Sequence, residues 1–228
     1  MSNIAIITAR GGSKGLKRKN ILQLNDKPLI AWTIEAALNS VGIDTCYVST
    51  EDEEIANISK DFGAKIIERP IELAQDNTLS EEVLAHAISY LNDRNVSFDT
   101  ITLLQPTSPL RTHSDLDSAF NLFKVKDANC VISVFEPNHS AAKAYKELPD
   151  GSISGLLSES APYSARQTLP STYQPNGAIY IFKVDIFNEK NRIPREKVYP
   201  YVMPENLSID IDSKEDFDRA QSIMRNVV

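Results

Sequence analysis

The segment TARGGSKGLKRKN, residues 8–20, combines glycines with basic side chains and contains no acid. Its cations are Arg10, Lys14, Lys17, Arg18 and Lys19. Glycine lets backbone N–H groups approach an anion closely, while arginine and lysine neutralise phosphate charge. The segment matches neither G-x-x-x-x-G-K-[ST] nor G-x-G-x-x-G, so a solvated turn would explain it in isolation. Because it directly follows an apolar run typical of a first strand, nucleoside triphosphate binding is the better interpretation.

Two carboxylates lie two residues apart in SIDID, residues 208–212. In extended chain, Asp210 and Asp212 point to the same side, and each raises the pKa of the other unless a cation intervenes. Magnesium takes one or two protein carboxylates together with substrate phosphates. From spacing alone, an exposed strand end leading into a helix explains the pair about as well. The basic segment elsewhere favours a nucleotide–magnesium site.

Two other segments place polar groups after expected strands. In residues 69–83, Arg69 precedes a proline and Ser80 lies near a helix start, where Thr78 and Glu81 have the spacing of a capping box. In LLQPTSPLR, residues 103–111, Gln105 carries an amide that both donates and accepts, as reading a base edge requires. A helix N-terminus and a rigid turn are the simpler interpretations of these two segments.

The elements that must position these groups follow an alternating pattern. Strands are expected at residues 4–8, 45–50, 64–69, 100–105, 129–136 and 178–187, with a short one at the acidic pair. Helices are expected at residues 27–41, 52–63, 78–94, 114–126 and from 213 onward. This alternation predicts a mostly parallel sheet with helices on both faces, which binds ligands at the carboxyl ends of its strands.

Residues 137–177 interrupt the alternation with prolines and glycines and without a long apolar helix. About forty residues is too long for an ordinary connection, so we expect a functional or interfacial insertion here.

Composition narrows the class of protein. The chain has 228 residues, enough for one sizeable α/β domain, and 31 acids against 24 bases argue against a general nucleic-acid binder. We find no run of the roughly 20 apolar residues that a membrane helix needs, and no signal-peptide pattern. Cys46 and Cys130 lie in apolar runs, which favours reduced, buried thiols. We therefore expect a cytoplasmic protein with neither a membrane nor a nucleic-acid partner.

Together, these segments resemble the bacterial CMP-sialic acid synthetases, or acylneuraminate cytidylyltransferases, nearly end to end. The motifs that carry the resemblance are ARGGSKGLKRKN, VSTEDEEIA, RPIELAQDNTLS, LLQPTSPLR, QPNGAIYI and SIDID. The resemblance implies a three-layer α/β/α nucleotide-binding fold, Rossmann-like and of the nucleotide-diphospho-sugar transferase type. It also implies a single domain, residues 1–228, whose insertion at residues 138–176 forms a homodimer and part of the sugar site.

The reaction implied by the resemblance joins CTP to the anomeric hydroxyl of a nonulosonic (sialic-type) acid, releases pyrophosphate and requires Mg²⁺. Catalytic roles would fall to Arg10, Lys19 and Asp212, and the metal to Asp210 and Asp212. The nucleotide would be bound by Ala9, Arg10, Gly12, Lys14, Asn20, Arg69, Ser80 and Gln105. The sugar would be bound by Gln105, Lys143, Arg166, Gln174 and Asn176. Lys17 and Arg18 receive no role.

One position departs from the family pattern. Sialic acid enzymes of this kind typically have Arg-Pro-Asn-Gly where this chain has QPNG, with Gln174 in place of the arginine. A neutral amide forgoes a charge-assisted bond to the sugar acid, worth about 1.5–3 kcal/mol. Either Lys143 and Arg166 bind the carboxylate, or the sugar is a 5,7-diamino relative such as legionaminic or pseudaminic acid. More distant alternatives are a KDO cytidylyltransferase and a non-catalytic nucleotide-binding regulator.

Overall fold

The computed structural model describes residues 1–227, and its centre is a seven-stranded sheet in the order β11-β7-β10-β6-β1-β4-β5. The strands are β1 (Asn3–Thr8), β4 (Thr45–Thr50), β5 (Lys65–Glu68), β6 (Thr100–Leu104), β7 (Cys130–Phe135), β10 (Gln174–Lys183) and β11 (Val198–Val202). β1 runs parallel to both of its neighbours, β4 and β6, whereas β10 runs antiparallel to β6 and β7. The mostly parallel sheet is therefore confirmed.

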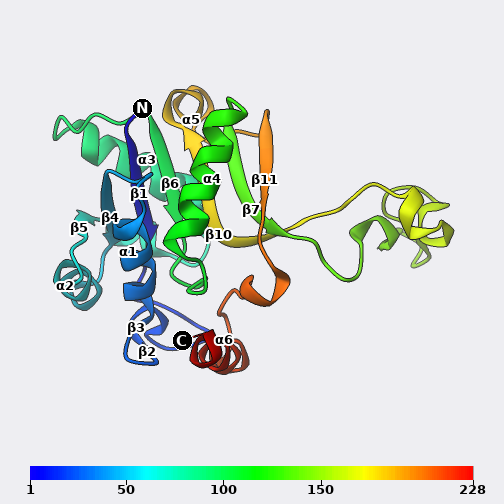
Figure 1. Ribbon diagram of the computed structural model, residues 1–228, viewed down its shortest axis with the longest axis horizontal. Coiled ribbons are helices and arrows are strands. Elements are labelled where there is room, and N and C mark those ends of the chain that lie inside the picture. The colour runs from blue at the N-terminus through cyan, green and yellow to red at the C-terminus, as the bar shows by residue number, and fades with distance from the viewer. Residues whose placement is uncertain (228) are drawn as a thin grey trace.

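Helices cover both faces of the sheet (Figure 1). On one face, α1 (Leu29–Asn39), α2 (Glu53–Asp61) and α4 (His113–Val125) pack against the strands. On the other face, α3 (Ser80–Asn92) and α5 (Val184–Lys190) do so. With two helical layers around it, β1 is buried along most of its length, which is why its sequence is apolar rather than alternating. The three-layer α/β/α prediction is confirmed.

The last helix, α6 (Lys214–Val227), contributes to a separate small core. That core includes Leu24 of the hairpin formed by β2 (Gln23–Leu24) and β3 (Lys27–Pro28), together with Phe217 of α6. The chain that leads from the sheet to α6 is thus fixed near the segment that follows β1. This packing brings the basic segment, residues 8–20, and the acidic segment, residues 208–212, to the same side of the molecule.

The helix boundaries show which residues cap α2 and α3. Asp52 caps α2 by accepting a hydrogen bond from the backbone of Ile55 at 3.0 Å, and Gly63 follows the helix with φ +92°. The capping box expected from Thr78 and Glu81 is wrong, because α3 begins only at Ser80. Glu82 instead accepts a bond from the Leu79 backbone N–H at 2.9 Å.

Both cysteines are buried and unbridged, as expected. Burial raises the pKa of the Cys46 and Cys130 thiols to about 12, so neither ionises near neutral pH.

Residues 136–173, which we call the arm, project from the body between β7 and β10 (Figure 1). The arm contains the hairpin of β8 (Tyr145–Glu147) and β9 (Ile153–Gly155), and the 3₁₀ turns η3 (Ala141–Lys143), η4 (Ala161–Tyr163) and η5 (Arg166–Thr168). These short elements agree with the expectation of a segment without a long helix. Elsewhere too, no helix among residues 1–227 combines the length and apolarity that crossing a membrane requires.

Candidate active site

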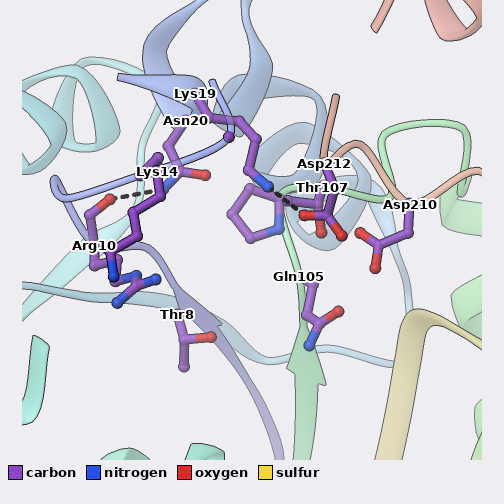
Figure 2. A pocket seen from close by; sticks show the side chains of 12 residues that line it. Thr8, Arg10, Lys14, Lys19, Asn20, Gln105, Thr107, Asp210 and Asp212 are labelled. Carbon is purple, nitrogen blue, oxygen red and sulfur yellow. Dashed lines mark hydrogen bonds and ion pairs between the residues drawn. The ribbon is translucent and has the colours of Figure 1, made fainter. Parts of the chain in front are cut away.

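A cleft of about 350 Å³ opens at the carboxyl ends of β1 and β6 and collects side chains from three distant parts of the sequence (Figure 2). The predicted site residues that line it are Arg10, Lys14, Lys19, Asn20, Gln105, Asp210 and Asp212. Figure 2 shows Arg10 and Lys14 on one side of this cleft, Asp210 and Asp212 on the other, and Lys19 extending toward Asp212. The structure thus brings these predicted residues together at this edge of the sheet.

Two glycines allow the basic loop, residues 8–20, to pass close to acidic groups. A Cβ atom at Gly11 would lie 2.3 Å from Asp52 Oδ2, and one at Gly15 would lie 2.4 Å from the Asp212 carbonyl oxygen. The Gly11 backbone N–H also donates to Glu51 Oε1 at 2.7 Å. A Cβ at Gly12 would meet nothing within 4 Å. Gly11 and Gly15 are therefore the positions where a side chain would clash, and the nucleotide-binding role of Gly12 stays a prediction.

Arg18 ties the basic loop to the start of α2. It adopts a left-handed backbone conformation, φ 57°, and its guanidinium binds the Asp52 carboxylate, with Nη2 3.0 Å from Oδ1. This hydrogen bond is the main reason why the pKa of Asp52 is lowered. Arg18 thus holds the loop in place, a role that the sequence did not indicate, whereas Lys17 is exposed.

Arg10 and Lys14 converge on a single carboxylate. Arg10 Nη1 lies 2.9 Å from Asp76 Oδ1, and Lys14 forms an ion pair with the other oxygen of Asp76. The bond from Lys14, followed by that from Arg10, lowers the pKa of Asp76. Asp76 thus pairs with both of these cations in this structure.

Lys19 links the basic loop to the acidic segment. Its Nζ donates to Asp212 Oδ1 at 2.8 Å and to the Ile211 carbonyl at 2.6 Å. Next to it, the buried Asn20 amide donates to the Arg10 carbonyl at 3.0 Å and fixes the loop backbone.

The acidic pair faces the cleft as predicted, although the short strand expected there does not form. A bond from the Ile211 N–H to the Thr107 carbonyl, 2.8 Å long, holds residues 208–212 against the loop after β6. Ile209 and Ile211 are buried while Asp210 and Asp212 are exposed, so the alternation survives without a strand ladder. Thr107 also lines the cleft, and the sequence did not predict this residue as part of the site.

The electrostatics of this pair suit a cation. Asp210 is open to solvent in the cleft, but close packing of protein around its carboxylate raises its pKa. The charge of Asp212 raises this pKa further. The hydrogen bond from Thr107 and the charge of Lys19 lower it. Across residues 1–227, no cluster of three or more His, Cys, Asp or Glu side chains is placed to hold a metal. Two carboxylates beside a basic, glycine-rich loop are a donor set that fits magnesium, which takes one or two protein carboxylates and fills its remaining positions with water and substrate phosphates.

A second cavity of about 240 Å³ adjoins the cleft and shares Thr8 and Arg10 with it. It is lined by two further predicted residues, Arg69 and Ser80. Arg69 is 7% exposed and donates from Nε to Ser49 Oγ at 3.2 Å. Burial lowers the pKa of Arg69 to about 10, so it remains charged at neutral pH. Arg10 therefore stands between two adjacent cavities, each lined by predicted ligand-binding groups.

Apart from Gln105, the predicted sugar-binding residues do not line either cavity. Lys143 and Arg166 lie on the arm, and Gln174 is exposed at the start of β10. Asn176 is 3% exposed, and its amide bonds to protein, with Oδ1 accepting from Ser133 Oγ at 2.6 Å and Nδ2 donating to Ser208 Oγ at 2.9 Å. The roles of these four residues stay predictions.

The three-layer fold and a cleft with cations facing carboxylates define an α/β protein of the nucleotidyltransferase type. The chain belongs to the cytidylyltransferase family, whose profile matches residues 4–225. It is 36% identical over 223 residues to the N-acylneuraminate cytidylyltransferase of Escherichia coli O18:K1:H7 (strain RS218 / NMEC), covering 97% of this chain but only 52% of that protein. It is 32% identical over 226 residues to the pseudaminic acid cytidylyltransferase of Campylobacter jejuni subsp. jejuni serotype O:23/36 (strain 81-176), covering 99% and 97% of the two chains.

Solved structures show the same fold at low sequence identity. A CMP:2-keto-3-deoxy-manno-octonic acid synthetase complexed with CTP superposes with a TM-score of 0.72 at 18% identity, over 100% of both chains. A 4-diphosphocytidyl-2C-methyl-D-erythritol synthase from Anaerococcus prevotii superposes with a TM-score of 0.67 at 13% identity, over 98% of both chains.

Proposed function

We propose that this chain transfers CMP from CTP to the anomeric hydroxyl of a nonulosonic acid in the cytoplasm and releases pyrophosphate. The observation that carries the proposal is the single cleft in which Arg10, Lys14 and Lys19 face Asp210 and Asp212. The family supports cytidylyl transfer, and the relatives named for N-acylneuraminate and pseudaminic acid support a nine-carbon sugar acid as acceptor. The chain spans about half the length of the E. coli relative, so we base the acceptor class equally on the Campylobacter protein, which it covers almost fully.

In this reaction the hydroxyl oxygen of the sugar forms a bond to the α-phosphorus as the bond to the bridging oxygen of the β-phosphate breaks. The hydroxyl proton is released and pyrophosphate leaves. Arg10, Lys14 and Lys19 would neutralise the triphosphate and the charge that grows on the leaving group, which requires alignment and fixed charge rather than a covalent nucleophile. Asp210 and Asp212 would hold Mg²⁺, which when bound supplies positive charge at the phosphate oxygens.

We assign the nucleoside to the second cavity and the end of β6. Arg10 borders both cavities, so a triphosphate in the cleft can continue into a nucleoside beside Arg69 and Ser80. Gln105 offers the amide that can read a cytosine edge.

The test of this function is pyrophosphate release from CTP and Mg²⁺ with a panel of acceptors: N-acetylneuraminic, legionaminic, pseudaminic and 3-deoxy-manno-octulosonic acids. We expect release with at least one nine-carbon acid. Release with the eight-carbon acid alone would replace our acceptor with KDO, and no release with any member would contradict the proposal.

We further propose that the arm joins two chains and brings Lys143 and Arg166 to the partner's sugar site. The arm exposes several apolar side chains, among them Ile153, Leu157 and Tyr163, of which Tyr163 is 82% exposed. An exposed apolar group of this kind favours contact with another protein surface. Lys143 and Arg166 are distant in sequence from the residues that line the chain's own cleft, and the arm projects away from the body.

Replacing Leu157 and Tyr163 together by glutamate is therefore expected to convert a dimer into a monomer of 25.4 kDa. Light scattering after size exclusion measures the mass. Because the cleft itself is intact, CTP should still bind while turnover with the sugar is lost. Val125→Glu, at an apolar residue 72% exposed on α4, is the matched control and should remain dimeric. A double variant with wild-type mass would contradict the role of the arm.

Gln174→Arg is expected to shift acceptor preference toward N-acetylneuraminic acid. A restored charge-assisted bond to the sugar acid, about 1.5 kcal/mol, corresponds to roughly tenfold in relative kcat/KM. The measurement compares N-acetylneuraminic acid with the 5,7-diamino acids in the same panel. Gln23→Arg, at an exposed position on β2, controls for added charge. An unchanged ratio would remove Gln174 from the choice of sugar.

A further inference from the structure

Arg111 is an unusual arginine, because it is 2% exposed and makes its hydrogen bonds to neutral oxygen atoms. Its Nη2 donates to the Gln105 carbonyl at 3.2 Å and to Thr33 Oγ1 at 2.9 Å, and its Nη1 donates to the Ser108 carbonyl at 3.2 Å. Burial lowers the pKa of Arg111 to about 10, which leaves it charged at neutral pH. Burying a cation away from water is unfavourable unless its surroundings compensate, so its position behind the cleft calls for an explanation.

The two carbonyls that Arg111 binds bracket one wall of the cleft. Gln105, Pro106 and Thr107 line the cleft, and the guanidinium fork spans the ends of this turn from behind. The turn is also closed by a bond from the Ser108 N–H to the Gln105 carbonyl at 3.3 Å. Because the fork is planar and rigid, it fixes the distance between the two carbonyls in a way that one ammonium group cannot.

The same turn positions the acidic pair. The Thr107 carbonyl accepts the bond from the Ile211 N–H at 2.8 Å, and the Thr107 side chain is near enough to Asp210 to lower the pKa of that carboxyl. Ile211 lies between Asp210 and Asp212, so a shift of the turn would move both carboxylates. On its other side, Thr33 anchors Arg111 to α1. Arg111 thus connects a helix of the scaffold to the side chains of the cleft.

We propose that Arg111 is a positioning residue that clamps the turn of residues 105–108, so that Gln105 on the nucleotide side and Asp210 and Asp212 on the metal side are held in one geometry. The inference rests on the proposed function, because it takes the cleft to be the CTP site. Arg111 itself is buried behind the cleft and acts through the backbone of the turn.

The test compares CTP affinity and kinetics of Arg111→Met, Arg111→Lys and Ile88→Ala. Methionine fills the space without donors, and lysine keeps the charge but loses the fork. Ile88 is 4% exposed on α3, on the opposite face of the sheet, so its truncation destabilises the fold without touching the turn. The Kd for CTP is measured by calorimetry with Mg²⁺ present, and KM values are measured at a temperature where circular dichroism shows each variant folded.

We expect Arg111→Met to weaken CTP binding at least tenfold and to raise the KM for CTP. Arg111→Lys should recover less than half of the lost CTP affinity on a logarithmic scale. If the methionine variant does not fold, the lysine variant alone tests the inference. Ile88→Ala should keep the wild-type Kd despite a lower melting temperature. Wild-type CTP affinity in a folded Arg111 variant would overturn the inference. Failure of the wild-type protein to bind CTP would instead contradict the proposed function.

Discussion

Asp210→Asn is expected to lower kcat/KM by about 1,000-fold and, in the same protein, to raise the melting temperature. Activity is lost because the substitution removes one of the two carboxylates that would hold Mg²⁺ at the phosphates. If the metal stabilises the transition state by about 4 kcal/mol, its loss lowers kcat/KM roughly 1,000-fold. The gain in stability follows from the raised pKa of Asp210, whose ionised form is disfavoured by burial and by Asp212.

The direction of the stability change follows from the linkage between protonation and folding. A carboxyl whose pKa is higher in the folded than in the unfolded state binds protons more readily when folded, so stability falls as pH rises through the unfolded pKa. Above the unfolded pKa, Asp210 therefore lowers the stability of the fold, and asparagine, which cannot ionise, removes that loss. Pyrophosphate release and thermal unfolding measure the two effects.

Asp218→Asn is the matched control for this experiment. Asp218 lies on α6 and pairs with Lys214 on the surface, outside the cleft. It should leave kcat/KM within twofold of wild type. An Asp210→Asn protein with near-normal turnover would remove the acidic pair from the mechanism, and one with a lower melting temperature would contradict our account of the electrostatics.

Lys19→Met is expected to reduce kcat/KM by about 100- to 1,000-fold, the loss typical of one fixed electrostatic donor at a reacting group. The Lys19 side chain is 13% exposed, and its ammonium already reaches both Asp212 and the Ile211 carbonyl, so its charge is placed between the basic loop and the acidic segment. Steady-state kinetics with CTP as the varied substrate measure the effect.

Lys17→Met tests whether position, rather than total charge of the loop, matters. Lys17 is two residues away and exposed. We expect Lys17→Met to keep turnover within about threefold of wild type, because an exposed charge is screened by solvent and salt. Equal losses in the two variants would mean that the loop attracts the nucleotide only through its net charge.

The sequence predicted most strands of the central sheet because their burial pattern is strong, but β11 was not expected, and residues 184–187, expected as strand, belong to α5. The apolar run of β1 indicates burial on both faces. The alternation of Ile209, Asp210, Ile211 and Asp212 indicates which side chains are buried and which face outward. For that reason the acidic pair faces the cleft even though no strand ladder forms there. The glycine-rich, basic composition of residues 8–20 likewise indicated an anion site before any contact was known.

What the sequence could not predict are contacts between distant segments. Asp76 and Asp52 pair with the basic loop from positions more than thirty residues away, and nothing in their local sequence distinguishes them from other surface acids. Arg111 was missed for a related reason: arginine is mostly exposed in proteins, so a buried one has no sequence signature. The arm lacks helical or strand periodicity over most of its length, so its projection from the body required the structure.

Transfer of CMP to a sugar acid is tested by ³¹P nuclear magnetic resonance of one reaction mixture. The mixture contains CTP, Mg²⁺, the protein and the best acceptor of the panel. The account predicts that the three CTP signals are replaced by one phosphodiester signal and by pyrophosphate, in equal molar amounts, and only when the acceptor is present. CDP with orthophosphate, pyrophosphate formed without acceptor, or bound CTP that never turns over would contradict it.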